Sequence, residues 1–253
     1  MKEQLLRFKN KQKYLLFDYE TCNLNLISGH NKPWQLAFLV IENNKIVEEK
    51  DYWLKWDDLR VSPEAAKITG FTQAKYKKNA VDPQLALDDF EKYLYDDSYV
   101  KVGHNLLGFD VYMHNLHRKL INPKAKSDFS YMDNLVDTLS LAKALKKQIK
   151  LNNEDDFLSW QYRLNHLIER GLSCNLKQCC KDFDVPFDAT KLHDALYDIR
   201  VNYEVFKKMI WEIAPNPGRI RMYTSGCPKN QIFFLMIRRP PRSPLFPYTT
   251  LFR

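Results

Sequence analysis

The segment KYLLFDYE, residues 13–20, constrains the fold more than any other part of the sequence. Its apolar run at 14–17 predicts a strand that is buried at the centre of a sheet. Asp18 and Glu20 follow, and at positions i and i+2 of a strand their carboxylates point to the same face. The sequence therefore predicts a sheet whose central strand ends in two neighbouring acidic groups.

These two carboxylates need compensation, because burial without a partner strongly disfavours their charged form. A divalent cation would supply it, since hard carboxylate oxygens suit Mg²⁺ or Mn²⁺. The alternative is that the strand ends at an exposed edge, where acids need no ion. Asp18 and Glu20 alone do not decide between a metal site and an exposed edge.

Strand and helix patterns alternate through about the first 220 residues. Apolar runs predict strands at 35–42 and 46–56, joined by a turn at Asn43 and Asn44, and a short strand at 99–104. Apolar residues at helical spacing predict helices at 82–96, 109–120, 135–147 after a short lead-in, 173–183 capped by Ser173, and 194–213. This order predicts an α/β fold, a mixed sheet flanked by helices in a single domain.

Residues 148–171 interrupt this alternation before the last two helices. One interpretation is a flap that stacks on bases and contacts phosphates, built from Trp160, Tyr162, Lys143, Lys146, Lys147 and Lys150. An ordinary helix with one apolar face fits the same pattern. The sequence leaves both interpretations open.

A second acidic signal lies in GHNLLGFD, residues 103–110. A short strand leads through a polar turn to Asp110, which falls in the first turn of the next helix. There Asp110 suits either a metal ion or simply the helix N-terminus. Asn105 either donates to a phosphate or sugar, or caps the helix.

The third signal is HDALYD, residues 193–198, at the start of the long last helix. His193 precedes the helix and Asp198 lies one turn into it, so both can face a site at the helix start. Asp194 is alternatively a plain N-terminal helix acid. A single histidine is usually structural, and only the neighbouring acids make His193 a candidate for catalysis.

Composition narrows the class of protein. The five cysteines form neither a C-x-x-C pair nor a zinc-ligand spacing, which indicates reduced thiols in a cytoplasmic protein; they are Cys22, Cys174, Cys179, Cys180 and Cys227. No apolar run approaches the length of a membrane span, and no signal-peptide core follows the charged N-terminus. We therefore expect neither a membrane segment nor a secretion signal.

Residues 223–253 form a tail with a composition of its own, rich in Pro, Arg and Phe. About its last twenty residues closely resemble the conceptual translation of a sequencing adaptor; a recruitment peptide is the alternative. We assign the domain to residues 1–222 and expect the true C-terminus to be missing. Without the tail the chain has 34 basic and 31 acidic residues, an excess that supports nucleic-acid binding only weakly.

Three motifs in order, F-D-Y-E-T at 17–21, H-N-x3-F-D at 104–110 and H-x4-D at 193–198, resemble those of the DEDDh 3′→5′ exonucleases. That family has the ribonuclease H-like fold. The resemblance runs from about Tyr14 to Phe206, with smaller echoes at 68–72 (I-T-G-F-T), 136–139 (V-D-T-L) and 176–187. The spacing of the second motif resembles exonuclease I, which degrades single-stranded DNA, more than the epsilon-type proofreading subunits.

The resemblance implies hydrolysis assisted by two divalent cations, Mg²⁺ or Mn²⁺. It implies that Asp18, Glu20, Asp110 and Asp198 hold the ions and that His193 is the general base. It suggests as substrate-binding residues Tyr19, Thr21, Thr69 and Asn105. The implied substrate is the 3′ end of single-stranded DNA, the product a nucleoside 5′-monophosphate, and a polymerase partner would fit a proofreading role.

Two rival functions remain at this point. A ribonuclease of the same family would use identical chemistry and differ only in how it reads the 2′-OH. A non-catalytic module that binds nucleic acid or a polymerase would use the same fold, but loss of a key acid would be expected, and all five key positions are filled. No residue of the sequence decides between DNA and RNA, and only the resemblance to exonuclease I favours DNA.

Overall fold

A computed structural model of the chain describes residues 11–23, 31–151 and 156–213. Its six strands are β1 (Lys13–Thr21), β2 (Pro33–Glu42), β3 (Lys45–Leu54), β4 (Ala80–Val81), β5 (Tyr99–Gly103) and β6 (Leu135–Asp137). They form one sheet in the order β4-β3-β2-β1-β5-β6. β1 pairs antiparallel with β2 and parallel with β5, so the sheet is mixed and β1 lies inside it.

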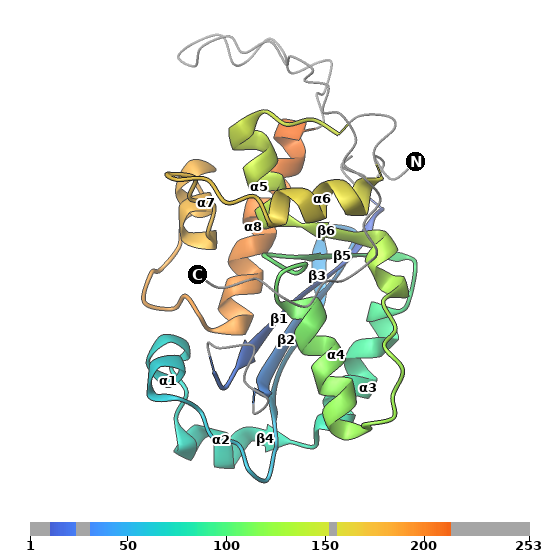
Figure 1. Cartoon of the computed structure of the whole chain (residues 1–253), viewed down its shortest axis with the longest axis vertical. Helices are drawn as coiled ribbons and strands as arrows, with labels where there is room; N and C mark the ends of the chain where they lie inside the picture. Colours follow the sequence, from blue (N-terminus) through green and yellow to red (C-terminus); the bar gives the residue numbers. More distant parts are fainter. Residues whose placement is uncertain (1–10, 24–30, 152–155, 214–253) are drawn as a thin grey trace.

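Eight α-helices accompany the sheet within the described ranges: α1 (Pro63–Thr69), α2 (Gln73–Asn79), α3 (Pro83–Leu94), α4 (Asp110–Ile121), α5 (Thr138–Lys147), α6 (Phe157–Asn165), α7 (Leu176–Asp182) and α8 (Ala195–Ile213). A short 3₁₀ helix, η2 (Ser130–Asn134), precedes β6. Figure 1 shows α3 and α4 on one side of the sheet and α5, α7 and α8 on the other. The predicted fold class, a mixed sheet flanked by helices, is confirmed.

The alternation of side chains along β1 decides which face of the sheet carries the acids. Leu15, Phe17 and Tyr19 are buried in the core under α3 and α4. Tyr14 and Leu16 belong to the core under α5, α7 and α8. Because successive side chains of a strand point to opposite faces, the next two even-numbered residues of β1, both acidic, face α8.

The β2–β3 hairpin follows the prediction from its turn residues. Asn43 and Asn44 have φ angles of 51° and 60°. Such left-handed pairs match the twist of a two-residue hairpin, and asparagine tolerates them better than most residues. The turn places β3 beside β2 and thereby extends the sheet away from β1.

The structure corrects one expectation about local structure and adds short elements that were not predicted. The helix expected from Ser173 is α7, which begins at Leu176 and is capped by Asn175, whose side chain accepts a hydrogen bond from the Gln178 amide at 2.9 Å. The lead-in before residue 138 is a strand, β6, which pairs with β5. Helices α1 and α2 were not predicted, since seven residues each give too little periodicity to read.

The interrupting segment contains α6, an ordinary helix with one buried face. Trp160 is 4% exposed and packs in the core, so it cannot stack on a base. Lys143 is buried and donates to the Asn165 carbonyl oxygen at 2.5 Å, while Lys146 and Lys147 pair with acidic side chains. The flap interpretation is therefore wrong for these residues.

Within the described ranges, no helix is both long and apolar enough to cross a membrane. Cys22, Cys174, Cys179 and Cys180 are free and buried, as expected of reduced thiols. Cys227 and the rest of the tail lie outside the described residues.

Candidate active site

Acidic side chains from three separate segments of the chain influence the pKa of Asp18. Asp18 lies in the C-terminal half of β1, three residues before its end, and is half-buried. Burial raises its pKa well above the ordinary value, and the carboxylates of Asp110, Glu20 and Asp198 raise the pKa further. The pKa of Glu20 is likewise raised, first by burial and then by Asp198 and Asp110. Acids that lie up to 180 positions apart in the sequence are therefore near enough in the fold to influence the carboxylate of Asp18.

Asp110 is the most deeply buried member of this carboxylate cluster, at 1% exposed. It is the first residue of α4, and its Oδ1 accepts a hydrogen bond from the Tyr19 backbone amide at 2.9 Å. Burial raises the pKa of Asp110 well above its usual range, and the Tyr19 amide opposes that rise. The same hydrogen bond fixes the start of α4 against the end of β1.

Asp198 lies in the first turn of α8 and is half-buried. Burial raises its pKa to about 7, against the opposing hydrogen bond from the His193 backbone amide. That amide donates to Asp198 Oδ2 at 3.1 Å. Asp198 Oδ1 is also buried, and among the described residues it has no hydrogen-bond partner.

His193 lies two residues before the start of α8 and is an exposed residue. Its φ of 71° is in the left-handed region, which turns its amide toward Asp198. Partial burial lowers the pKa of its imidazole below the ordinary value. Asp194 caps the helix, since its Oδ1 accepts from the Tyr197 amide at 2.9 Å, and this confirms the structural alternative for Asp194.

A buried polar network holds the loop between β5 and α4, and sequence reasoning missed its centre. Asp137, at the end of β6, is fully buried. Its carboxylate accepts from the backbone amides of Asn105 at 3.0 Å and Leu107 at 3.1 Å, and from Asn165 Nδ2 at 2.8 Å. Because this loop leads directly into Asp110, Asp137 positions an element of the carboxylate cluster. The resemblance of V-D-T-L, residues 136–139, to the exonuclease family was the sequence signal that could have identified Asp137.

Asn105 takes part in the same network. Its φ is 70°, and its Oδ1 accepts from Asn165 Nδ2 at 3.1 Å. Gly108 makes room for this contact, since a Cβ there would lie 2.5 Å from Asn105 Oδ1. Because the Oδ1 of Asn105 already accepts this hydrogen bond, its Nδ2 is the group with which the side chain can donate.

The structure corrects the expected role of Tyr19. Its side chain is buried on the face opposite Asp18 and Glu20, and its hydroxyl lies 3.3 Å from His117 Nδ1. The Tyr19 side chain therefore cannot reach a nucleotide at the carboxylate cluster. Its contribution is the backbone amide that holds Asp110.

The two threonines expected to contact substrate have internal partners. Thr21 is buried, and its hydroxyl bonds to the side chain of Asn31. Thr69 ends α1, and its hydroxyl donates to the Ala65 carbonyl oxygen at 2.9 Å. Thr69 is half-buried and keeps its lone pairs as acceptors. Substrate contact by either residue stays a prediction.

The chemistry of the carboxylate cluster fits a divalent cation. In the described ranges, no three or more His, Cys, Asp or Glu side chains already stand close enough together to hold an ion. The charged groups that raise the pKa of Asp18 are nevertheless all carboxylates. Asp198 Oδ1 has no hydrogen-bond partner in the described part of the chain. Carboxylate oxygens are the donors that Mg²⁺ or Mn²⁺ prefers, and a bound cation would relieve the burial and repulsion that raise these pKa values.

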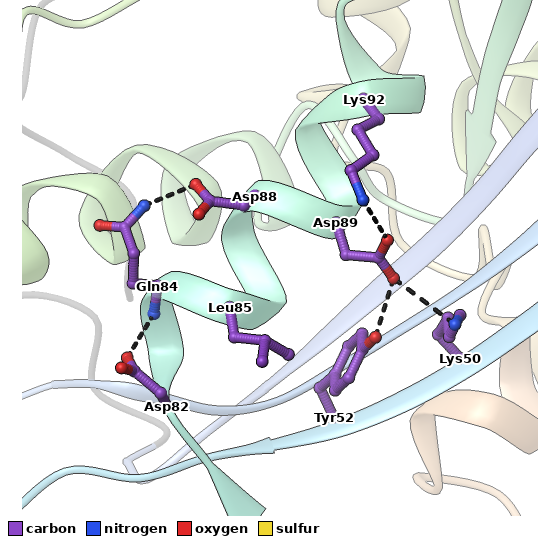
Figure 2. Close-up of a pocket in the computed structure, with 8 residues that line it drawn as sticks. All are labelled: Lys50, Tyr52, Asp82, Gln84, Leu85, Asp88, Asp89 and Lys92. Atoms are coloured by element: carbon purple, nitrogen blue, oxygen red, sulfur yellow. Dashed lines mark hydrogen bonds and ion pairs between the residues drawn. The ribbon is translucent and has the colours of Figure 1, made fainter.

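A hollow of ≈ 490 Å³ lies elsewhere, between β3 and α3. Figure 2 shows that its charged residues bind one another: Asp89 accepts from the Tyr52 hydroxyl at 2.8 Å and from Lys92 at 2.9 Å. Gln84 likewise donates hydrogen bonds to the carboxylates of Asp82 and Asp88. The hollow is separate from the carboxylate cluster, because α3 covers the opposite face of the sheet.

Comparison with known proteins decides the family. The sequence profile of the RNase_T exonuclease family matches residues 15–206, which include all four acids and His193. The chain belongs to the exonuclease family. Exonucleases of this fold generally use divalent metal ions, and the resemblance seen in the motifs is confirmed at this level.

One curated relative is the PolC-type DNA polymerase III of Ureaplasma parvum, which is 25% identical over 202 residues. The alignment covers 78% of this chain but only 11% of that polymerase. Among solved structures, the complex of Escherichia coli exonuclease I with single-stranded DNA matches with a TM-score of 0.58 at 19% identity. It covers 79% of this chain and 40% of exonuclease I, so the exonuclease domain corresponds to less than half of that protein.

Two further structures have the same fold. Exonuclease I of Methylocaldum szegediense matches with a TM-score of 0.59 at 19% identity, over 81% of this chain and 41% of its own. A 3′-exonuclease that recognises the histone mRNA stem-loop matches with a TM-score of 0.55 at 10% identity, over 80% and 64%. The fold is thus shared by proteins that act on DNA and on RNA, and it does not by itself choose between these substrates.

Proposed function

We propose that this chain is a metal-dependent 3′→5′ exonuclease that hydrolyses single-stranded DNA from its 3′ end and releases nucleoside 5′-monophosphates. The observation that supports the proposal is that the carboxylates of Asp110, Glu20 and Asp198 all lie near enough to Asp18, toward the end of β1, to raise its pKa. Two divalent cations would balance four carboxylates in charge. When bound, they would stabilise charge on the attacking and leaving oxygens of the scissile phosphate.

The residues of the chain have distinct parts in this mechanism. Asp18, Glu20, Asp110 and Asp198 would hold the ions through their carboxylate oxygens. The Tyr19 amide orients Asp110, and the network around Asp137 keeps the loop before α4 in place. His193 would accept the proton of the attacking water. Its lowered pKa leaves the imidazole neutral, and so able to take a proton, at neutral pH.

DNA is the favoured substrate because exonuclease I, the repeated structural match, was solved with single-stranded DNA. The second candidate is an exoribonuclease, which the fold of the histone mRNA 3′-exonuclease supports. A polymerase partner belongs to the proposal as well, since the curated relative is a polymerase that contains a similar segment.

The test uses the chain with Mg²⁺ or Mn²⁺ and 5′-labelled single-stranded DNA and RNA of equal sequence. We expect a ladder of products that shorten from the 3′ end, faster on DNA and abolished by EDTA. Faster RNA cleavage would select the exoribonuclease. Cleavage of neither substrate by folded protein would favour a non-catalytic binding module.

The role of His193 is tested by replacement with asparagine, which cannot accept the proton but tolerates the left-handed backbone that His193 adopts. We expect His193→Asn to lose about 10²-fold or more in rate at pH 7.5. The wild-type rate should rise with pH through an ionisation below the ordinary histidine pKa and then level off, and the variant should lack that ionisation. An unchanged pH–rate profile would show that another group is the base.

A further inference from the structure

The α1–α2 unit carries an unbalanced positive charge. Four lysines, Lys67 on α1 and Lys75, Lys77 and Lys78 on α2, are exposed, and α2 contains no acidic residue. None of the ion pairs among the described residues involves any of these four, which we call the basic face. By contrast, Lys146 and Lys147 near α7 are both paired with acids.

Tyr76 fixes the orientation of α2 and so directs the lysines outward. It is 5% exposed, and its hydroxyl donates to the Leu54 carbonyl oxygen at 2.8 Å and accepts from the Trp56 amide at 2.7 Å. Lys78 is two positions further along the helix, almost opposite Tyr76, while Lys75 and Lys77 flank it at about 100° on either side. All three therefore point away from the core that anchors the helix.

The basic face adjoins the end of the sheet that carries the acids. The Ser62 amide, at the start of α1, donates to the Cys22 carbonyl oxygen at 2.9 Å, two residues beyond Glu20. Phe71, between α1 and α2, packs edge-on against Trp34 with ring centroids 5.0 Å apart. Trp34 precedes Gln35, which pairs with Glu20 across the strands. Figure 1 also shows α1 near the end of α8 where that helix begins.

The lysines of the basic face repel one another within α2. Like charges three positions apart on a helix repel and weaken it slightly, and α2 offers no acid to offset them. The last-turn lysines do favour the helix dipole, but Lys75 lies outside that turn. With its charge balanced by two cations, the neighbouring carboxylate cluster offers no net attraction to the rest of a strand, so a long strand gains from a positive surface beside it.

We propose that the basic face binds the phosphate backbone of the single strand behind its 3′ end and guides that end to the carboxylate cluster. The proposal rests on the proposed function, because it names where that function's substrate lies. Exposed, unpaired lysines act on phosphates as point charges without reading bases, so the strand is held independently of its sequence.

The test compares two triple variants of the full chain. Lys75→Gln/Lys77→Gln/Lys78→Gln removes the α2 charges. The matched control, Lys119→Gln/Lys124→Gln/Lys126→Gln, removes three exposed lysines that have no ion pair among the described residues. Because α4 begins at Asp110, Lys119 lies about 13 Å further along the helix axis, and Lys124 and Lys126 follow the end of that helix.

Binding is measured without cleavage, by fluorescence anisotropy of a labelled 20-nucleotide DNA strand in EDTA. The α2 variant should bind at least ~10-fold more weakly at 0.1 M salt. Its plot of log affinity against log salt should be shallower by about 2, because three lysines no longer neutralise phosphates of the strand. The control should stay within about twofold of wild type. With metal, the KM of the α2 variant should rise for the long strand but not for a dinucleotide, at unchanged kcat.

Equal effects of the two variants, or an unchanged salt slope, would overturn the proposal, since the lysines would then act only on the helix itself. An equal loss on the dinucleotide would do the same. A different result would refute the proposed function: wild-type protein that cleaves no substrate with metal present. That result does not depend on the binding measured by anisotropy.

Discussion

Asp18→Asn is expected to lower the rate of 3′-end hydrolysis by about 10³-fold or more, a barrier higher by at least ~4 kcal/mol. The substitution keeps the shape of the side chain and removes its charge. The carboxylates of Asp110, Glu20 and Asp198 all raise the pKa of Asp18, so loss of its charge affects the whole cluster. The assay is single-turnover cleavage of 5′-labelled single-stranded DNA with Mg²⁺.

Asp51→Asn is the matched control for this variant. Asp51 lies on β3 opposite Ala37, which in turn pairs with Asp18, so both acids share one face of the sheet. Gln35 Nε2 donates to Asp51 Oδ1 at 2.8 Å, and an asparagine at 51 can accept the same bond. We expect Asp51→Asn to stay within tenfold of wild type. Activity of Asp18→Asn within tenfold would end the two-metal mechanism.

Without metal, the chain should become less stable as pH rises from 5.5 to 8.5. Burial raises the pKa of Asp198 to about 7, and the pKa values of Asp18 and Glu20 are raised well above their ordinary range. A carboxyl whose pKa is higher in the folded than in the unfolded state stabilises the fold while protonated, and this contribution is lost as pH rises through the folded pKa. Within this pH range the loss should be on the order of 2–4 kcal/mol, accumulating as pH rises toward each folded pKa and ending once pH exceeds it.

The measurement is thermal unfolding in EDTA across that pH range, repeated with Mn²⁺. Mn²⁺ should remove the loss at high pH, because the ion balances the charges that repel one another. Asp18→Asn should show a shallower pH dependence in EDTA, since it has one carboxylate fewer. Constant or rising stability of the metal-free chain between pH 6 and 8 would show that the four acids do not form a repulsive buried cluster.

The sequence predicted the parts of the fold that have long or regular signals. The apolar run before Asp18 identified the central strand, and Asn43 and Asn44 identified the hairpin turn. The three-residue strand β6 and the helices α1 and α2 were not predicted, because so few residues define no period. Asn175 rather than Ser173 caps α7, a choice between two capping residues that only tertiary packing makes.

The same contrast holds for the candidate site. The four acids were proposed because their motifs occur in order, and three of them influence the pKa of Asp18 in the structure. The Tyr19 side chain was assigned to the wrong side, although its place between Asp18 and Glu20 on a strand already puts it on the opposite face. Asn165 could not be predicted, because its contacts with Asp137 and Asn105 depend on how α6 folds back across the sheet.

The most direct test of the carboxylate cluster is a count of bound Mn²⁺ by equilibrium titration in the presence of a nucleoside 5′-monophosphate. The proposed mechanism predicts two ions per chain at pH 8, weakened or lost in Asp18→Asn and retained in Asp51→Asn. No bound Mn²⁺, or equal binding by wild type and Asp18→Asn, would contradict the assignment of these acids to a catalytic metal centre.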